Sequence, residues 1–576
     1  MKYLYWCCFL LGMNWQANAQ DLIFRSSFQG DDVNVLSFGI LDADLSVSSE
    51  VIRIPASDAT ASDSETQLLP NTGADILRHG WEVIDAITLR TVFTSTQSNP
   101  TFTCPQDGRG AYDVRLTVET DNEYSVFRQR RLITCVLPRS DAGRTVHTID
   151  LSTGSTYFAN GEINGVVVQP GDLVRISGSA PDNQNLQFLD FRGTPEAPIH
   201  FINEGLVTHD DAGKLLHLIN CEHMILDGKG SAFVYGFHLS SNNGSGETAV
   251  FVRGKTTGIE IYGVKITVDS GSGIEVNTRG TDDYNRSNWQ HDNLRIHHNY
   301  VAAAHHEGFY IGYTNDNNDN PPDFWAAYQI HDGKIYRNRI ENTGWDGLQV
   351  ANMVSGMEVH DNFVQETGLS NTASQKSAYQ QNAGNGGYVY NNILLGGIGG
   401  NVQQGETGGE TYFFSNVLAG NVAAGQNQAV YGFGGPSNND SYYWFSNTLV
   451  SPAHGFRLNS QRGELNHFTL THNLFLLGAV DDDVFQFATP APGGTVITTT
   501  PNLQRAPADD ADLCLVDRSN NDFRINCAQS AALDSAPMSL DTVFPVELIP
   551  FKQHMDITGR VFNDTNSYGA YWSTSD

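Results

Sequence analysis

Two carboxylates occupy matching places in a repeated stretch of the sequence. Glu307 lies in HHEGFYIG and Asp346 in TGWDGLQV, each directly before a glycine. If successive repeats stack as strands, the two residues lie about 5 Å apart. Glycosidases use such a pair, one as the acid that protonates the leaving oxygen and one as base or nucleophile. Repulsion between close carboxylates raises one pKa, as a general acid requires. We therefore predict that Glu307 and Asp346 are catalytic, with their individual roles unassigned.

Further polar and aromatic groups are expected around this pair. His306 and Trp345 precede the two acids, so Trp345 offers a face for a sugar ring and His306 a group that tunes or replaces one carboxylate. Alternation along the strands predicts one outward column of possible substrate contacts beside the acids, made of Glu275, Tyr310, Gln349 and Gln403. His306 and Tyr310 also suit a rival chemistry, in which they serve as base and acid of a β-elimination.

A structural interpretation of the two acids stays open. A carboxylate before a glycine can simply accept turn N–H bonds or hold a cation. Arg337, beside Asn338, is a candidate substrate contact, although an exposed arginine commonly forms only a surface ion pair.

Two long insertions, 278–293 and 313–333, interrupt the repeat in adjacent coils. Loops of this length in a compact repeat are usually functional. They carry Trp289 and Trp325, which we expect to stack on sugar. They also carry acidic residues that could bind Ca²⁺, although their spacing does not match an EF-hand and a solvated loop is favoured: Asp282, Asp283, Asp316, Asp319 and Asp323. Ca²⁺ is the one cofactor considered, and no other metal site is predicted.

The elements that must position these residues recur through the middle of the chain. Alternating apolar residues, then an asparagine, then more apolar residues appear seven times, with Asn299, Asn338, Asn362, Asn392, Asn416, Asn447 and Asn473 as the shared position. Such a period, with strand-like alternation, indicates the coils of a parallel β-helix. The asparagines are interpreted as a structural ladder in which each amide bonds to neighbouring coils. The apolar column Ile296, Ile335, Val359, Val389 and Phe413 is interpreted as core.

The flanking sequence carries two resemblances to known families. The stretches Pro170-Gly171-Asp172 and GTPEAPI (193–199) resemble the opening coils of pectate-lyase-like and chondroitinase-like right-handed β-helix proteins. The stretch GAYDVRLTV (110–118) resembles the end of a PKD-type immunoglobulin-like domain. The expected fold is therefore all-β, with a signal peptide at 1–19, a β-sandwich at 20–142, a right-handed parallel β-helix at 143–490 and a closing segment at 491–576.

Composition limits the partners and the compartment. The net charge of −31 makes nucleic acid an unexpected partner, because phosphate binding needs clustered Lys and Arg. No run after the signal is apolar for long enough to cross a bilayer, so we expect a secreted protein, and a monomer. Export favours two disulfides, Cys104 with Cys135 and Cys514 with Cys527. Cys221 is expected to be a buried, inert thiol.

These observations predict a secreted enzyme that cleaves a polysaccharide, with hydrolysis slightly favoured. A lyase acting on a uronic-acid polymer is the first alternative, and a non-catalytic glycan-binding or adhesive solenoid is the second, because the resemblance covers all these activities. The sequence lacks the calcium-and-arginine pattern of pectate lyases and the paired aspartates of polygalacturonases, so the sugar stays open.

Overall fold

The computed structural model describes most of residues 143–505, with short gaps, and outside that span only the strands given below. The chain divides into two compact units, one formed by Met1–Ile84 with Phe93–Pro138 and the other by Asp85–Val92 with Arg139–Asp576. Every regular element among the described residues is a β-strand. That part of the chain contains no helix long and apolar enough to cross a membrane.

The first unit centres on a mixed sheet with the strand order β4-β9-β8-β5-β6. Trp81 on β5 is buried and belongs to the core of this unit. The stretch GAYDVRLTV lies in β8, which is antiparallel to β9. The strands of this region are β1 (Leu22–Ile23), β2 (Val35–Ser37), β3 (Gly39–Ile40), β4 (Ile52–Pro55), β5 (Ile76–Asp85), β6 (Thr91–Ser95), β7 (Thr101–Thr103), β8 (Gly110–Thr120) and β9 (Tyr124–Val136). The side chains of Cys104, Cys135, Cys514 and Cys527 lie outside the described residues.

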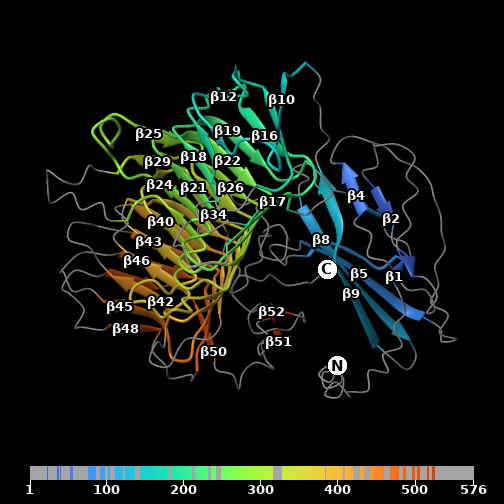
Figure 1. The fold of residues 1–576 in the computed structure, drawn as a ribbon. Coiled ribbons are helices and arrows are strands. Elements are labelled where there is room, and N and C mark those ends of the chain that lie inside the picture. Colours follow the sequence, from blue (N-terminus) through green and yellow to red (C-terminus); the bar gives the residue numbers. More distant parts are fainter. Residues whose placement is uncertain are drawn as a thin grey trace, which may run out of the picture. The chain divides into compact units, whose positions relative to one another are not determined.

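The second unit is a right-handed parallel β-helix, as predicted (Figure 1). Between residues 199 and 487 each coil passes through three parallel sheets, here called sheets I, II and III. Sheet I consists of β10 (Val146–Asp150), β14 (Leu173–Ser177), β16 (Ile199–Asn203), β19 (Glu222–Asp227), β22 (Thr257–Tyr262), β26 (Arg295–His297), β30 (Lys334–Tyr336), β34 (Met357–His360), β37 (Gly387–Tyr390), β40 (Glu410–Phe414), β43 (Ser441–Phe445), β46 (His467–Thr471) and β49 (Val496–Thr499).

Sheet II follows sheet I in each coil. It consists of β17 (Val207–Asp210), β20 (Phe237–Ser241), β23 (Val264–Val268), β27 (Tyr300–Ala303), β31 (Arg339–Glu341), β35 (Phe363–Thr367), β38 (Ile393–Gly397), β41 (Val417–Ala419), β44 (Thr448–Val450), β47 (Leu474–Leu476) and β50 (Leu503–Arg505). Neighbouring strands in such a sheet lie about 4.8 Å apart.

Sheet III completes each coil. It consists of β11 (Tyr157–Phe158), β15 (Leu186–Leu189), β18 (Leu216–Ile219), β21 (Val250–Arg253), β24 (Ile274–Asn277), β28 (Phe309–Ile311), β32 (Leu348–Val350), β36 (Tyr379–Gln381), β39 (Val402–Gln404), β42 (Gln428–Phe433), β45 (His454–Asn459) and β48 (Phe485–Phe487). Smaller sheets are formed by β12 (Glu162–Ile163) with β13 (Val166–Val167), by β25 (Gln290–Asp292), β29 (Gln329–His331) and β33 (Met353–Ser355), and by β51 (Leu515–Asp517) with β52 (Asp522–Ile525).

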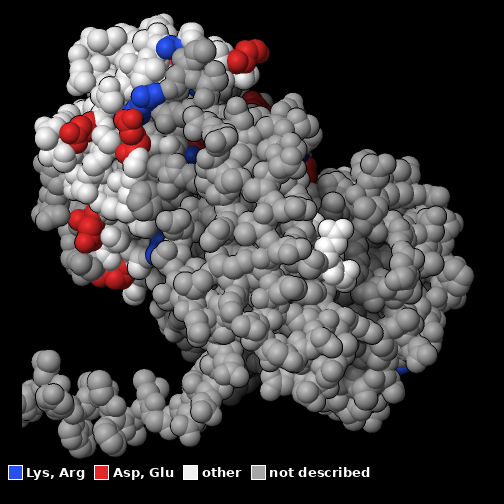
Figure 2. Space-filling model, turned by 90° about the vertical axis from the view of Figure 1, so that its right-hand side faces the viewer, with Lys and Arg blue, Asp and Glu red and all other residues white. Residues whose placement is uncertain are grey.

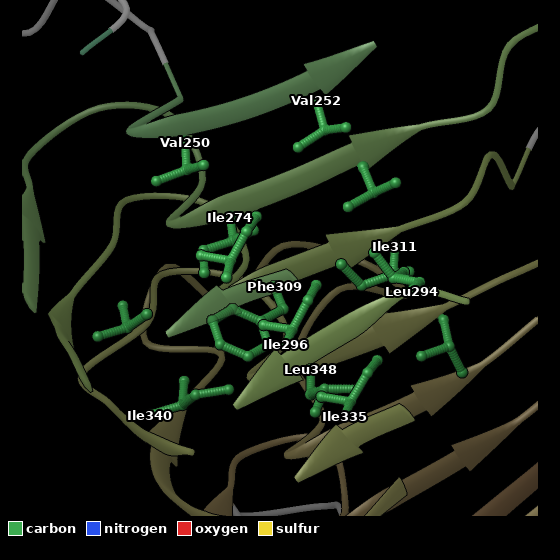
Figure 3. Close-up of a cluster of buried hydrophobic side chains, with 14 of the residues drawn as sticks. Val250, Val252, Ile274, Leu294, Ile296, Phe309, Ile311, Ile335, Ile340 and Leu348 are labelled. Atoms are coloured by element: carbon green, nitrogen blue, oxygen red, sulfur yellow. The ribbon is translucent and has the colours of Figure 1, made fainter. Parts of the chain in front are cut away.

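The core lies inside the coils, where alternate side chains of all three sheets meet. Val250, Ile274, Phe309 and Leu348 come from successive strands of sheet III and are buried one above another (Figure 3). Fully burying a side chain of this size contributes about 1.5–3 kcal/mol. The predicted apolar column of sheet I, from Ile296 to Phe413, is confirmed as buried. Cys221 is a free, buried cysteine in the same core, as expected.

The predicted asparagine ladder forms the corner between sheets I and II, here called the asparagine corner. Asn392 shows the pattern: its Nδ2 donates to the Asn416 side chain at 3.0 Å and to the Val359 carbonyl at 2.9 Å. Its Oδ1 accepts from the backbone N–H and the amide of Asn362, at 3.1 and 3.0 Å. The residue before each repeated asparagine has a left-handed φ, for example 54° at Asn391. This residue makes the turn, and the side-chain amide of the asparagine that follows bonds to the backbone groups around the turn.

The solenoid extends past the predicted end at residue 490. Strands β49 and β50 add another coil, and Asn502 continues the ladder by accepting the N–H of Asn473 at 2.9 Å. The coil therefore runs to Arg505 at least, because the amide and both strands pair with the coil before.

Candidate active site

Glu307 and Asp346 lie on adjacent coils at the corner between sheets II and III, here called the acidic corner and made of Ser272, Glu307, Asp346 and Ser377. The backbone stacks them in register, since the N–H of Gly308 donates to the Asp346 carbonyl at 3.0 Å. Glycine is required at 308, because a Cβ there would lie 2.3 Å from Ile340 Cγ2 and 2.5 Å from the Gly347 carbonyl. The close approach of the coils therefore explains the glycine after each acid.

Glu307 is a buried carboxyl at this corner, with 4% of its surface exposed. Its Oε2 accepts a hydrogen bond from the Ser272 hydroxyl at 2.9 Å. Burial raises its pKa to about 7, the hydrogen bond from Ser272 opposes the shift, and the nearby Glu275 charge adds to it. A carboxyl with this pKa keeps its proton in about half of the molecules at pH 7, where an ordinary carboxyl has lost it, and a general acid needs that protonated form.

Asp346 is more deeply buried, with no exposed surface. Its Oδ1 accepts the backbone N–H of Ser377 at 2.6 Å. Burial raises its pKa well above the usual value, and the charge of Glu307 raises it further. The structure thus brings the two predicted acids within electrostatic reach of each other, and it keeps Asp346 away from solvent.

An aromatic pair lies beside the acids. The rings of His306 and Trp345 stack with centroids 4.0 Å apart and planes at 24°, and both side chains are half-buried. Burial, followed by the charge of His305, lowers the pKa of His306, so its imidazole is neutral at neutral pH. The two rings form the aromatic surface next to Glu307 and Asp346 that the sequence predicts.

The predicted outward column runs along sheet III, with one additional member. Register places Glu275, Tyr310, Gln349, Gln380 and Gln403 on successive strands. Gln380 was missed because its coil has alanine where the others have glycine. Gln349, Gln380 and Gln403 are nearly fully buried, and the Gln403 amide donates to the Ser374 carbonyl at 3.5 Å.

Glu275 and Tyr310 stand at the acidic end of this column. Glu275 is half-buried, and its carboxylate accepts from Thr248 Oγ1 and from Asn277 Nδ2, both at 3.0 Å. The Tyr310 hydroxyl bonds to the Thr314 hydroxyl at 2.9 Å. Burial raises the pKa of Tyr310, the hydrogen bonds of Thr314 oppose this, and the charges of Glu307 and Glu275 add to it.

Three other predicted contacts do not join this group in the described structure. Arg337 lies at the asparagine corner, across sheet II from Asp346, with a left-handed φ of 53°. Trp289 donates its indole N–H to the Thr256 carbonyl at 3.3 Å and lies under the ammonium of Lys255. Trp325 lies outside the described residues.

The structure identifies no cation site in the part it describes. No group of three or more His, Cys, Asp or Glu side chains there could hold a metal ion. Asp282 and Asp283 are exposed, whereas Asp316, Asp319 and Asp323 lie outside the described residues. On the face in Figure 2, the described Asp and Glu side chains are spread singly among few Lys and Arg.

Some residues of the site have a weak signal in the sequence. Thr248 and Asn277 hold Glu275, and Asn277 follows it by two residues on the same strand, a spacing that places both on the outward face. Thr248 lies one coil earlier, and no repeated motif marks it. Ser377 aligns with Asp346 only once the coil that contains Ala378 is recognised.

Comparison with known proteins finds likeness in architecture only. No protein-family model matches the chain, and no curated protein sequence is similar to it. A GH136 lacto-N-biosidase from Eubacterium ramulus has a TM-score of 0.37 and 12% identity over 63% of this chain and 68% of that chain. The pectate lyase Pel9A has a TM-score of 0.30 and 11% identity over 75% of this chain and 90% of that chain.

A family 28 exopolygalacturonase from Yersinia enterocolitica has a TM-score of 0.16 and 9% identity, over 84% of this chain and 98% of that chain. Identities and TM-scores this low transfer no residue roles, so the candidate site rests on its own geometry. The chain itself has the architecture of a right-handed parallel β-helix.

Proposed function

We propose that this β-helix is an exported glycoside hydrolase that cleaves a polysaccharide at the acidic corner, with Glu307 as the general acid. The observation that carries this proposal is the buried Glu307 carboxyl, whose pKa is raised to about 7, beside polar and aromatic side chains. Export is proposed from the signal-like residues 1–19.

In the proposed reaction Glu307 gives its proton to the glycosidic oxygen as the bond to the anomeric carbon breaks. A second carboxylate then assists the attack of water on that carbon. The stacked rings of His306 and Trp345 bind the sugar next to the bond that breaks. Asp346 lies within electrostatic reach of Glu307 and is the second acidic group of this corner.

The outward column favours a substrate without carboxylates. From Glu275 to Gln403 its five members are one acid, one tyrosine and three glutamines, with no Lys or Arg among them. Amide and phenol groups pair with sugar hydroxyls, whereas a uronate is usually held by Arg or by a cation. A neutral polysaccharide is therefore the proposed substrate class, and hydrolysis is its matching chemistry.

A lyase is the second candidate because one observation favours it. The imidazole of His306 is neutral at neutral pH, owing to its lowered pKa, and could take a proton from a uronate ring while Tyr310 supplies one. The column described above offers no cation to stabilise the uronate carboxylate, so elimination ranks below hydrolysis.

Product analysis of the full chain tests the proposal. Neutral polysaccharides such as xylan, mannan and laminarin, and acidic ones such as pectate, alginate and chondroitin sulfate, are incubated with wild type, Glu307→Gln and the control Glu260→Gln. Glu260 is an outward glutamate of sheet I, hydrogen-bonded to His297. We expect new reducing ends from a neutral polymer with wild type and control, and none with Glu307→Gln.

The other outcomes contradict the proposal in distinct ways. Unsaturated products with ultraviolet absorbance would identify a lyase. Retained binding without any new reducing ends would identify a non-catalytic glycan-binding solenoid. Full activity in Glu307→Gln would remove Glu307 from the reaction.

A further inference from the structure

We propose that Glu275, not Asp346, is the carboxylate that works with Glu307, as the base that activates the attacking water. This assignment rests on the proposed function and names a further catalytic residue for it. It is argued from burial, hydrogen bonding and the position of each carboxylate in the stacked coils.

Asp346 is poorly placed to touch substrate or water. It has no exposed surface, and its Oδ1 is occupied by the N–H of Ser377. Burial also raises its pKa well above the ordinary value and so disfavours the charged form that a base or a nucleophile needs. We therefore give Asp346 a positioning role, in which it packs the corner behind Glu307.

Glu275 has the properties that Asp346 lacks. It points outward from β24 and is half-buried rather than enclosed. Its two oxygens accept from Thr248 and Asn277, both neutral donors, and hydrogen bonds of this kind favour the charged form of a carboxylate.

Glu275 and Glu307 lie on adjacent coils but at different positions along them. Glu275 lies directly below Tyr310 in the sheet, whereas Glu307 is bonded to Ser272, three residues before Glu275. The negative charge of Glu275 nevertheless contributes to the raised pKa of both Glu307 and Tyr310. Inverting glycosidases separate their carboxyls by about 6.5–9.5 Å so that a water fits between them.

The proposed step balances without another reactant. Water loses a proton to the Glu275 carboxylate while its oxygen bonds to the anomeric carbon. The bond from that carbon to the glycosidic oxygen breaks, and this oxygen takes the proton of Glu307. Solvent then returns a proton to Glu307 and removes one from Glu275.

Kinetics on the polymer that the wild type hydrolyses test the assignment. We expect Glu275→Gln to lower kcat by about 10²–10⁴-fold with little change in KM, and Asp346→Asn to lower it by about tenfold or less. Azide or formate should restore turnover to Glu275→Ala, because a small anion replaces the missing base. Glu260→Gln is the matched control and should remain fully active.

A readout without substrate accompanies these kinetics. In a chain labelled with ¹³C at glutamate carboxyls, the pKa of Glu307 should fall in Glu275→Gln, because one negative charge is lost, and should not change in Glu260→Gln. If Glu275→Gln does not fold, Glu275→Asp keeps the charge and should fold with reduced turnover.

The outcomes separate the two proposals. An active wild type whose folded Glu275→Gln or Glu275→Asp variant keeps at least half of the turnover overturns this assignment and leaves the proposed function intact. An unchanged Glu307 pKa in Glu275→Gln also contradicts it. A wild type that hydrolyses no polymer overturns the proposed function and this assignment together.

Discussion

The asparagine corner and the acidic corner belong to the same coils, yet they treat their buried polar groups in opposite ways. From Asn338 to Asn473, each amide at the asparagine corner donates to two acceptors and accepts from two donors, as Asn392 does. At the acidic corner two carboxyls are buried and have raised pKa values. One corner satisfies its polar groups and stabilises the stack, whereas the other buries ionisable groups whose charged form burial disfavours.

This difference indicates which polar residues of a solenoid are candidates for function. A repeated polar residue with every hydrogen bond satisfied on the adjacent coils is structural. Polar residues that stack in register but change type from coil to coil, such as Ser272, Glu307, Asp346 and Ser377, have no such repeated bonding. Buried ionisable groups with shifted pKa values are functional candidates for that reason.

The largest expected effect is the loss of turnover in Glu307→Gln. Removing a general acid lowers the rate by about 10²–10⁴-fold. Because the variant removes a buried ionisable group, its free energy of unfolding at neutral pH should be equal to or above that of the wild type. Urea unfolding and steady-state kinetics measure the two effects, and a strong loss of stability would make Glu307 a structural residue instead.

A substitution at the asparagine corner should have the opposite effects, a loss of stability with little change in turnover. Asn392→Ala leaves the Asn362 N–H and amide and the Val359 carbonyl without their partner, and it should lower the free energy of unfolding by about 3 kcal/mol. Turnover of the folded fraction should stay near the wild-type value. The control Asn288→Ala, at an exposed loop position, should change stability by less than about 1 kcal/mol.

The pH dependence of stability should also distinguish the corners. The folded pKa of Glu307 is about 7, against 4.5 for the ordinary carboxyl. Between these values the folded chain keeps a proton that the unfolded chain releases, so the free energy of unfolding falls as pH rises, by up to about 1.4 kcal/mol per pH unit. The difference between wild type and Glu307→Gln should show this slope, and the difference between wild type and Asn392→Ala should not.

The smallest expected effect concerns the outward column. Gln380→Ala removes one neutral side-chain partner for the substrate and should raise KM about fivefold with kcat nearly unchanged. A fall in kcat with constant KM would mean that Gln380 acts on the transition state rather than on binding.

The sequence predicts the asparagine corner well because one residue type recurs in every coil. It also predicts the neighbourhood of Glu307 and Asp346, since the glycine after each acid reflects close backbone approach. It misses Gln380, because Ala378 takes the glycine position in that coil. The burial of Asp346 could not be predicted, because it depends on other coils and loops that no local pattern reports.

The sequence also does not predict on which side of the solenoid a residue lies. Arg337 is adjacent to Asn338 in sequence, but the coil turns at the asparagine corner, so the arginine lies across sheet II from the acids. Asn502 was missed for a related reason: its coil, TTTPNLQRA, lacks the apolar alternation of the others.

The ionisation of Glu307 tests the central claim most directly, and it needs no substrate. In a chain labelled with ¹³C at glutamate carboxyls, NMR titration of wild type against Glu307→Gln identifies the Glu307 signal. We expect that signal to titrate at a pKa of about 7 and to be missing from the variant. A Glu307 signal that titrates near the ordinary value of 4.5 would contradict its role as the general acid.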